Sequence, residues 1–344
     1  MNSELRGRTR GATLADVAEY VGVSASTASR ALNGRGELSA ETRAAVLEAA
    51  EVLQFQPSVL ARSLRTRTTQ TVGFVVPDVA SPFYAAALKG AQGALEESGY
   101  RVMLMDSGQE VAGEVAALRT LLNHQVDGLL LSTVGISERG FDEIVGRRGT
   151  PCVFFDSMLP GIGAGSVTLD NVEGMNLLID HVVWHGHRRI AFLAGSLEET
   201  SGHERLEAFH AAMRRHGFDA PSELVRVCRW SQEKGRVATL ELLAVDPRPT
   251  AVVASSAELA LGCLAGSRER GLRLPEELAL ACFDDPYFGA LLEPALTAIG
   301  YDPGEVGREA AALLVDAIRN GGEARQRSVP VRLVCRRSCG CEAA

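Results

Sequence analysis

The chain has 344 residues, of which 46% are hydrophobic and 23% are charged. This length exceeds that of one ordinary domain and indicates two or three compact units, while the composition is ordinary for a globular protein. The sequence contains no apolar run of about 18 residues, which excludes a membrane-spanning helix. The polar start of the chain does not resemble a secretory signal. We therefore expect a cytoplasmic protein whose seven cysteines are reduced.

The charge of the chain is unevenly distributed. The total formal charge is −8, which by itself disfavours DNA binding. Residues 1–70 carry nine Arg against seven acidic residues, a net charge of +2, and the remainder carries 26 basic against 36 acidic residues, a net charge of −10. A small cationic end on an acidic body is typical of a protein that contacts nucleic acid with one end only.

Two short helices separated by a glycine are predicted within residues 13–33. Thr13 and Asp16 match a capping pattern at the start of the first helix. Gly22 suits the turn that follows, and Ser24 can cap the second helix. The outward face of the second helix consists of Ala25, Ser26, Ser29 and Arg30. This small, polar and cationic face suits entry into a DNA major groove, although an ordinary helical hairpin in a small bundle has the same pattern.

A third helix and a cationic joint follow. Ser39 can cap the third helix, which Pro57 terminates, and Ser58 can cap a very short fourth one. Residues 59–67 contain three arginines and no acidic residue. This segment is predicted to join a helical head to the body of the protein, and its alternative interpretation is an ordinary solvated linker.

From residue 71 onward, apolar strands alternate with helices. Buried strands are predicted at 71–76, 101–105, 126–131, 151–156, 190–193, 225–227, 251–254 and 278–283. Helices are predicted at 83–98, 110–123, 138–146, 304–319 and from about 201, 232 and 257 onward. Such alternation forms doubly wound sheets, and here the series occurs twice. We therefore predict two α/β lobes with a ligand cleft between them, at the carboxyl ends of the strands.

Polar residues on the loops of the lobes form a candidate ligand site. They are Asp78, Asp156, Arg205, Ser255, Ser256, Asp284 and Asp285. Phe83 and Trp230 add flat apolar surface, so the set suits a sugar, whose hydroxyl groups bind carboxylates and Arg. The alternative is that the aspartates only cap helices. We favour that alternative for Asp78 and a binding role for Arg205 and Asp284.

Other chemistry has less support in the sequence. His181, His185 and His187 have a spacing that metal sites use, but no cysteine is near them in sequence, so we expect no metal site there. Cys335, Cys339 and Cys341 could chelate a metal or form a redox pair, but we favour a frayed terminus with solvated thiols. No phosphate-binding loop or nucleophile motif is present, so we expect neither an enzyme nor a cofactor.

The chain carries a series of motifs, in the same order, that closely resembles the lactose-repressor (LacI/GalR) family of bacterial transcription regulators. The resemblance is carried by Leu-Ala-Asp-Val-Ala at 14–18, Gly-Val-Ser at 22–24 and the Pro-Ser-x-x-Ala-Arg-Ser-Leu pattern at 57–64. It continues in the body with Val-Asp-Gly-Leu at 126–129 and Phe-Asp-Asp at 283–285.

The resemblance implies a small all-α helix-turn-helix head at 1–56, a hinge helix and linker at 57–70, and a periplasmic-binding-protein-like body of two doubly wound lobes at 71–344. The first lobe would comprise about 71–166 and 303–327, and the second about 170–298 and 330–344. The implied crossing strands lie near 166–170, 296–302 and 328–332.

The implied function is that of a sequence-specific DNA-binding transcriptional regulator, a repressor controlled by a small sugar-like effector. The DNA-binding residues would be Thr13, Ser24, Ala25, Ser26, Thr27, Ser29, Arg30, Asn33, Ala61, Arg62 and Leu64. The effector-binding residues would be Phe83, Tyr84, Asp156, Arg205, Trp230, Ser255, Ser256 and Asp284. Because the chain lacks a C-terminal heptad helix, we expect a homodimer on a palindromic operator. A ligand sensor without DNA regulation and an effector-independent regulator are the alternatives.

The sequence departs from the family pattern at the effector site. The family usually has Asn-Asp where this chain has Ser255-Ser256, and Asn-Pro-Phe where it has Ser81-Pro82-Phe83. The two serines reach less far and lack the charge. We therefore expect an effector that differs from a typical monosaccharide in size or charge, or no effector at all.

Overall fold

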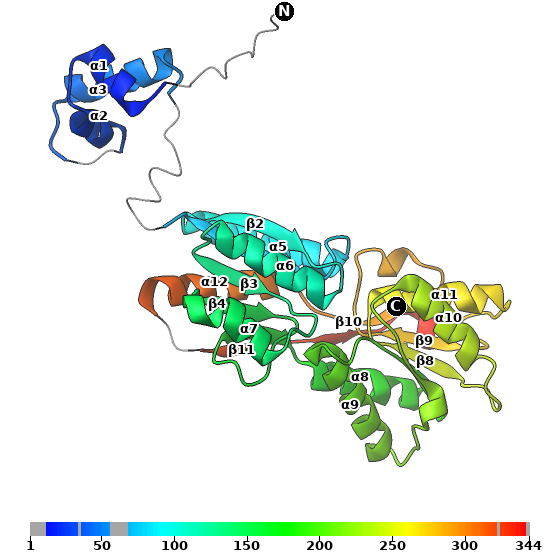
Figure 1. Ribbon diagram of the computed structural model, residues 1–344. Coiled ribbons are helices and arrows are strands. Elements are labelled where there is room, and N and C mark those ends of the chain that lie inside the picture. Colours follow the sequence, from blue (N-terminus) through cyan, green and yellow to red (C-terminus); the bar gives the residue numbers. More distant parts are fainter. Residues whose placement is uncertain (1–11, 34–35, 56–67, 322–323, 342–344) are drawn as a thin grey trace, which may run out of the picture. The chain divides into compact units, whose positions relative to one another are not determined.

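The structure of the protein is a computed structural model that describes residues 12–33, 36–55, 68–321 and 324–341. The chain divides into two compact units, Met1–Thr69 and Gln70–Ala344. In Figure 1 the first unit is blue, and the second runs from cyan to red. The described part of the first unit is helical, and the second unit contains two β-sheets flanked by helices.

Three short helices form the described part of the first unit: α1 (Leu14–Val21), α2 (Ala25–Leu32) and α3 (Ala40–Val52). The Thr13 N–H donates to Asp16 Oδ2 at 2.7 Å, and the Asp16 N–H donates to Thr13 Oγ1 at 3.3 Å, as the capping pattern predicts. Gly22 adopts a left-handed φ of 76°, which lets the chain turn between α1 and α2. The core of this unit includes Val17, Ala18, Ala28, Ala31, Val46, Ala49 and Ala50.

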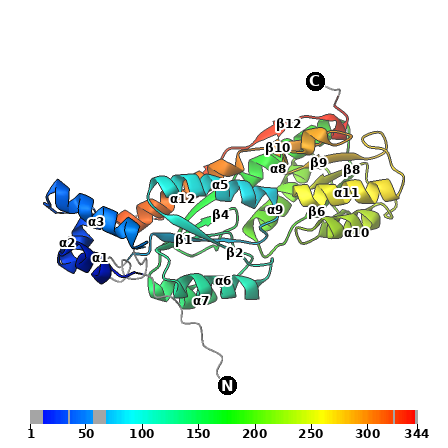
Figure 2. The same ribbon diagram turned by 90° about the horizontal axis from the view of Figure 1, so that it is seen from above.

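The first sheet of the second unit is entirely parallel and has the strand order β11-β5-β4-β3-β1-β2. Its strands are β1 (Thr71–Val76), β2 (Arg101–Asp106), β3 (Gly128–Leu131), β4 (Cys152–Phe155), β5 (Gly165–Leu169) and β11 (Gln326–Val329). Its helices are α5 (Pro82–Glu97), α6 (Val111–Asn123), α7 (Glu138–Ile144) and α12 (Pro303–Asn320). Helices α5 and α12 cover one face of the sheet, and α6 and α7 cover the other (Figure 2).

The second sheet has the order β12-β10-β9-β8-β6-β7, in which only the β10–β12 pair is antiparallel. Its strands are β6 (Ile190–Ala194), β7 (Val225–Val227), β8 (Ala251–Ala254), β9 (Ala279–Cys282), β10 (Thr297–Gly300) and β12 (Arg332–Val334). Its helices are α8 (Asn171–Trp184), α9 (Thr200–Arg215), α10 (Gln232–Leu242) and α11 (Ala257–Glu269). Helices α8 and α9 pack together on one face, and α10 and α11 pack together on the other.

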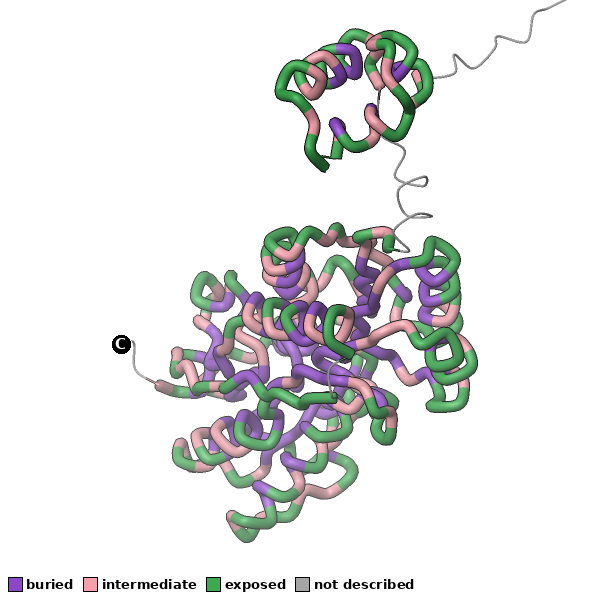
Figure 3. The backbone as a smooth tube through the Cα atoms, turned by 90° about the vertical axis from the view of Figure 1, so that its left-hand side faces the viewer, coloured by how far each residue is buried: buried purple, intermediate pink, exposed green. Residues whose placement is uncertain are grey.

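The chain crosses between the two sheets three times: from β5 to α8, from β10 to α12 and from β11 to β12. The two lobes predicted from the alternation of strands and helices are therefore present, and the helix predicted at 304–319 packs on the first sheet. Buried residues concentrate in the strands and on the inner faces of the helices (Figure 3). In each sheet the parallel strands end at the same edge. The loops that follow these strands can therefore line one cleft between the lobes.

Helices α5 and α12 approach each other closely because glycines line their contact. A Cβ added to Gly90 would lie 2.0 Å from the carbonyl oxygen of Gly304, and one added to Gly307 would lie 1.8 Å from the carbonyl oxygen of Ala87. Neither position has room for a side chain. The packing of α12 onto the first lobe therefore depends on these glycines.

Two parts of the second unit differ from the sequence-based expectations. Helix α8 was not predicted from the sequence; within it, a Cβ added to Gly174 would lie 2.5 Å from the Phe283 ring. The expectation of solvated thiols at a frayed C-terminus is wrong for Cys339, which is 1% exposed and ends the short helix η4 (Arg337–Cys339). Hydrogen bonds from Ser338 hold this helix against β9 and the loop before β10.

Candidate functional site

Helix α2 of the first unit presents a polar outer face. Ala25, Ser26 and Arg30 are exposed and Ser29 is half-buried, whereas Ala28 is buried against α1 and α3. This division agrees with the orientation predicted from the sequence. The exposed face carries one long cationic side chain among short ones.

Among the described residues, the hydrogen bonds of the Arg30 side chain are long. Its Nε donates to the Ser26 carbonyl at 3.4 Å, and its Nη2 donates to Thr27 Oγ1 at 3.5 Å. Both distances are at the upper limit for hydrogen bonds. The guanidinium can therefore exchange these contacts for stronger acceptors, such as the O6 and N7 atoms of guanine.

Three other predicted head residues also serve the fold. Ser24 Oγ accepts from the Thr27 N–H at 3.1 Å and caps α2, and Asn33 Nδ2 donates to the Ser29 carbonyl at 2.6 Å at the other end of that helix. Thr13 caps α1, and all three side chains are on exposed residues. The predicted hinge helix and its contact residues lie outside the residues that the structure describes and stay predictions: Ala61, Arg62 and Leu64.

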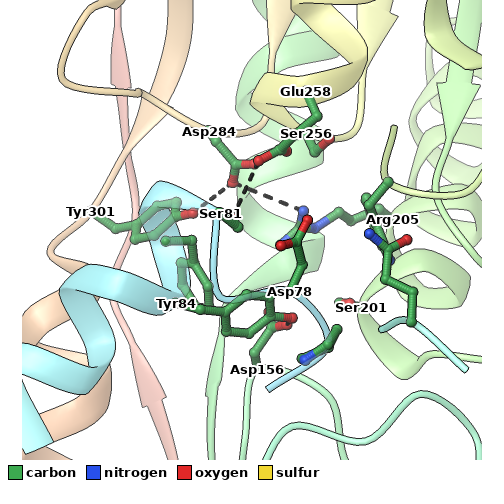
Figure 4. Close-up of a pocket in the computed structure, with 14 residues that line it drawn as sticks. Asp78, Ser81, Tyr84, Asp156, Ser201, Arg205, Ser256, Glu258, Asp284 and Tyr301 are labelled. Atoms are coloured by element: carbon green, nitrogen blue, oxygen red, sulfur yellow. Dashed lines mark hydrogen bonds and ion pairs between the residues drawn. The ribbon is translucent and has the colours of Figure 1, made fainter. Parts of the chain in front are cut away.

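A cleft between the two lobes collects most of the predicted effector-binding residues (Figure 4). It has about 50 Å³ of space enclosed between the side chains, and about 490 Å³ when the open solvent at its mouth is included. The first lobe lines it with Pro77, Asp78, Ser81, Phe83, Tyr84, Gln109 and Asp156. The remaining lining residues are Ser201, Arg205, Trp230, Ser256, Glu258, Asp284 and Tyr301.

Arg205, on α9, is a buried cation of this cleft, with 4% of its surface exposed. Its Nε donates to Asn171 Oδ1 at 2.8 Å, and its Nη1 donates to the Ser255 carbonyl at 2.6 Å. Its guanidinium carbon lies 3.7 Å from the centre of the Phe283 ring, and its Nη1 lies 4.0 Å from Asp284 Oδ1. Because a guanidinium carries five N–H donors, Arg205 can bind a ligand while these contacts hold its orientation.

Two carboxyl groups beside Arg205 are each bonded to a tyrosine. Tyr84 Oη donates to Asp156 Oδ2 at 2.8 Å, and Tyr301 Oη donates to Asp284 Oδ1 at 2.5 Å. Burial raises the pKa of Asp284 to about 6, although the charge of Arg205 opposes the change. Burial likewise raises the pKa of Asp156. Several acids around one guanidinium disfavour an anionic ligand and favour one that donates hydrogen bonds from hydroxyl groups.

The ring of Trp230 is fixed at one side of the cleft. Its Nε1 donates to Glu199 Oε1 at 2.8 Å. A Cβ added to Gly195 would come within 2.0 Å of this ring, so the ring packs directly on the glycine. Burial raises the pKa of Glu199 to about 8, which leaves its carboxyl group mostly protonated at neutral pH. Phe83 supplies a second aromatic surface from the first lobe.

The two serines that replace the family's Asn-Asp pair have different positions. Ser256 lines the cleft, and its Oγ accepts from the Leu259 N–H at 3.3 Å, which caps α11. Ser255 is fully buried, does not line the cleft and contacts Arg205 through its carbonyl group. Among the described residues, no hydrogen-bond partner is found for Ser255 Oγ. In this conformation Ser256 is the serine of the pair that faces a ligand.

Asp285 and Asp78, the two remaining predicted loop aspartates, have different contacts. Asp285 points away from the cleft residues and forms a bidentate pair with Arg336, at 2.6 and 2.8 Å. Asp78 lines the cleft, and its Oδ1 also accepts from the Ala80 N–H at 2.8 Å. Both interpretations of Asp78, the local cap and the lining residue, therefore describe it.

Several lining residues were not predicted. Tyr301 follows β10 directly, so the rule that polar residues after strands face the cleft could have found it. Glu258 and Ser201 lie in the first turns of α11 and α9. In such positions nothing in the sequence distinguishes a lining residue from an ordinary helix start.

Hydrogen bonds connect the lobes beside the cleft. Ser81 Oγ donates to Glu258 Oε1 at 3.2 Å, and Arg229 Nη1 donates to Glu110 Oε1 at 2.5 Å. A ligand that favours another arrangement of the lobes has to compensate for the loss of these bonds. Effector control requires such a difference in affinity between two conformations.

Comparison with known proteins identifies the family. Residues 13–58 match the model described as bacterial regulatory proteins, lacI family, and residues 179–339 match a periplasmic binding protein-like domain. The chain is 31% identical over 310 residues to the HTH-type transcriptional repressor CytR of Escherichia coli (strain K12), and the match covers 90% of each chain. The protein belongs to the lacI family of bacterial regulators.

Solved structures extend this assignment to the whole fold. The Lac repressor dimer bound to operator and the anti-inducer ONPF aligns with a TM-score of 0.87 and 26% identity, covering 96% of this chain and 99% of that one. A complex of the transcriptional regulator CelR with cellobiose aligns with a TM-score of 0.73 and 31% identity, covering 95% and 99%. The protein is therefore a DNA-binding transcriptional repressor with a helix-turn-helix head and an effector-binding body, and not an enzyme.

Across the part of the chain that the structure describes, each helix is too short or too polar to cross a membrane.

Proposed function

We propose that the repressor acts as a homodimer on a palindromic operator, with α2 of each head in one major-groove half-site. The observation that carries this proposal is the exposed face of α2, on which the hydrogen bonds of Arg30 to other described residues are 3.4 and 3.5 Å long. A similar protein, the Lac repressor, is a dimer bound to its operator. Two-fold symmetry of a dimer requires a palindromic site.

An exposed apolar pair in the second lobe supports dimerisation. Tyr287 and Leu291 are 84% and 83% exposed, and both lie on the segment between β9 and β10. Large apolar side chains grouped on a surface mark interaction sites. In a symmetric dimer such a patch would pack against its own copy.

Operator reading by Arg30 is tested with DNA that the full-length protein selects from random duplexes. The Arg30→Ala variant should bind the selected sequence at least about tenfold more weakly, because one bidentate contact to guanine contributes roughly 1–3 kcal/mol. Arg43→Ala removes the same charge from α3 and serves as the control. Equal loss of affinity for selected and random duplexes in Arg30→Ala, measured by mobility shift, would contradict base reading.

The proposed effector is a neutral, hydroxyl-rich molecule with one apolar ring face, such as a sugar. Arg205, Asp156 and Asp284 offer donors and acceptors for hydroxyl groups, and Trp230 offers a surface for a ring. The excess of carboxyl groups around Arg205 argues against sugar acids and phosphates. A related regulator, CelR, is solved in complex with cellobiose.

A thermal-shift screen tests the class of effector. Neutral mono- and disaccharides are compared with the matching sugar acids and sugar phosphates, and each stabilising compound is then tested for its effect on binding of the selected operator. We expect stabilisation by neutral sugars alone. Stabilisation by the anionic series, or by no member of either series, would overturn this assignment.

A further inference from the structure

Two chemical motifs far apart in the sequence meet on the outer side of the second lobe. His181 lies in the last turn of α8, and His185 caps the end of that helix four residues later. Cys339 and Cys341 lie 158 residues beyond His181 and 156 beyond His185, respectively, in the segment that follows β12. The four possible ligand atoms all lie within 4.8 Å of one another. Nothing in the sequence shows that the histidines and the cysteines lie close together. For this reason no metal site was predicted from the sequence.

The distances within this cluster match a tetrahedral metal site. His181 Nε2 lies 3.2 Å from Cys339 Sγ and 3.3 Å from Cys341 Sγ, and His185 Nε2 lies 3.2 Å from Cys341 Sγ. The two sulfur atoms are 3.6 Å apart. With Zn–S bonds of about 2.3 Å and Zn–N bonds of about 2.0–2.1 Å, ligand atoms of a tetrahedral zinc site are about 3.3–3.8 Å apart. These four distances lie within a few tenths of an ångström of that range, and the two remaining pairs lie within 4.8 Å, so side-chain movements of up to about 1 Å complete a tetrahedral site.

The fold fixes the cysteines rather than leaving them on a loose end. Ser338 Oγ donates to the Leu280 carbonyl at 2.6 Å and accepts from the Thr297 N–H at 2.8 Å. Cys339 is buried, and its Sγ lies 3.0 Å from Thr297 Oγ1. Both bonds connect η4 to the strands β9 and β10, so the first thiol is positioned before any ion binds.

The ligand set determines which ion it would hold. Two thiolates and two imidazoles are the composition of structural zinc sites, and soft sulfur ligands disfavour magnesium and calcium. Two thiolates balance the charge of Zn²⁺, so the half-buried site carries no net charge. Cys335 is exposed and lies 4.0 Å from Nδ1 of His181, the ring nitrogen that does not face the other cysteines. It also contacts Cys341, so it is placed as an outer neighbour of two proposed ligands.

We propose that His181, His185, Cys339 and Cys341 form a structural Zn²⁺ site that fastens the C-terminal segment to α8. The bound ion would join the end of η4 to a helix that packs against β9, β10 and β12. It would thereby stabilise the second lobe, because the ion binds the folded arrangement more strongly than the unfolded chain.

The test uses the full-length protein without a histidine tag, reduced and stripped of metal by a chelator. Titration with Zn²⁺ against a chromophoric chelator should give one tightly bound equivalent per chain and a raised Tm. Titration with Co²⁺ should give the thiolate-to-metal charge-transfer absorption of a tetrahedral site. Cys341→Ser should weaken zinc binding at least about tenfold and reduce this absorption.

Cys152→Ser is the matched control, since it removes a thiol from β4 of the first lobe, away from the cluster, and it should leave zinc affinity unchanged. His185→Asn provides a second ligand variant, and far-UV circular dichroism verifies that each variant is folded. The proposal is overturned if wild type binds much less than one equivalent, or if Cys152→Ser weakens binding as strongly as Cys341→Ser. It is equally overturned if Cys339 and Cys341 form a disulfide that persists in reductant, because both proposed sulfur ligands would then be lost.

Discussion

At the scale of single residues, the effector site depends on how Arg205 is held. Its Nε and Nη1 bind two different acceptors, Asn171 Oδ1 and the Ser255 carbonyl. A lysine ammonium is a single point and cannot keep both bonds and reach a ligand. We predict that Arg205→Lys abolishes the effector response while operator binding is retained. Calorimetry with a responsive sugar checks this, and equal affinity in both proteins would place the effector elsewhere.

Ser256 is the residue at which selectivity can be changed. Its Oγ caps α11, and an aspartate at this position can make the same cap. Ser256→Asp should therefore preserve the fold and add a carboxylate acceptor beside Arg205. We expect its affinity for common monosaccharides to rise relative to wild type in the same calorimetric assay. An unchanged order of preference would show that this side chain does not contact the ligand.

The buried carboxyl group of Glu199 predicts a pH dependence of stability. Its pKa is raised by burial from 4.5 to about 8, so the folded protein keeps a proton that the unfolded chain loses. The free energy of unfolding should thus fall as pH rises from about 5 to about 8. Glu199→Gln keeps an acceptor for Trp230 and cannot titrate. Relative to this variant, wild type should lose roughly 2–4 kcal/mol across that range in urea unfolding, and parallel pH profiles would refute the prediction.

At the scale of helices and strands, the contact between α5 and α12 should be intolerant of added volume. A Cβ on Gly307 would lie 1.8 Å from the Ala87 carbonyl oxygen, whereas one on Gly93, on the exposed side of α5, meets nothing within 4 Å. Gly307→Ala should lower the free energy of unfolding by about 1–3 kcal/mol through overpacking. Gly93→Ala should raise it by up to about 1 kcal/mol through helix propensity. Urea unfolding of both variants checks the opposite signs.

The elements that could be predicted are those whose signals are local. The capping pattern at Thr13, the turn at Gly22 and the continuous apolar strands depend on neighbouring residues, and the structure confirms them. Helix α8 was not predicted, and the close packing of its Gly174 on the Phe283 ring, which is distant in sequence, has no local signal. The cleft was predicted because polar residues that follow parallel strands face the ligand site. Applied to Tyr301, which follows β10, the same reasoning would have predicted one more lining residue.

The meeting of the histidines on α8 with the C-terminal cysteines depends on the whole topology. The antiparallel pairing of β12 with β10 brings the end of the chain beside α8. No local pattern encodes this proximity, so only the folded structure could show it.

At the scale of the whole molecule, the proposed dimer makes operator affinity depend on the exposed pair in the second lobe. Placing a charge in a self-complementary apolar patch disfavours association because the charge has to be desolvated. We predict that Leu291→Asp is a folded monomer with greatly reduced operator affinity. Sedimentation velocity and mobility shift measure the two effects. Val237→Asp, at another exposed apolar position, is the control, and an unaltered dimer in Leu291→Asp would move the interface to another face.

The pair of Arg336 with Asp285 has a consequence for the genetics of this repressor. Asp285 is adjacent to Asp284 of the cleft, so the segment after β12 supports the loop that carries a proposed effector-binding residue. A selection for mutants that no longer respond to the effector should therefore yield two classes of alleles. One class will alter cleft residues such as Arg205, and the other will map to codon 336, far downstream in the gene.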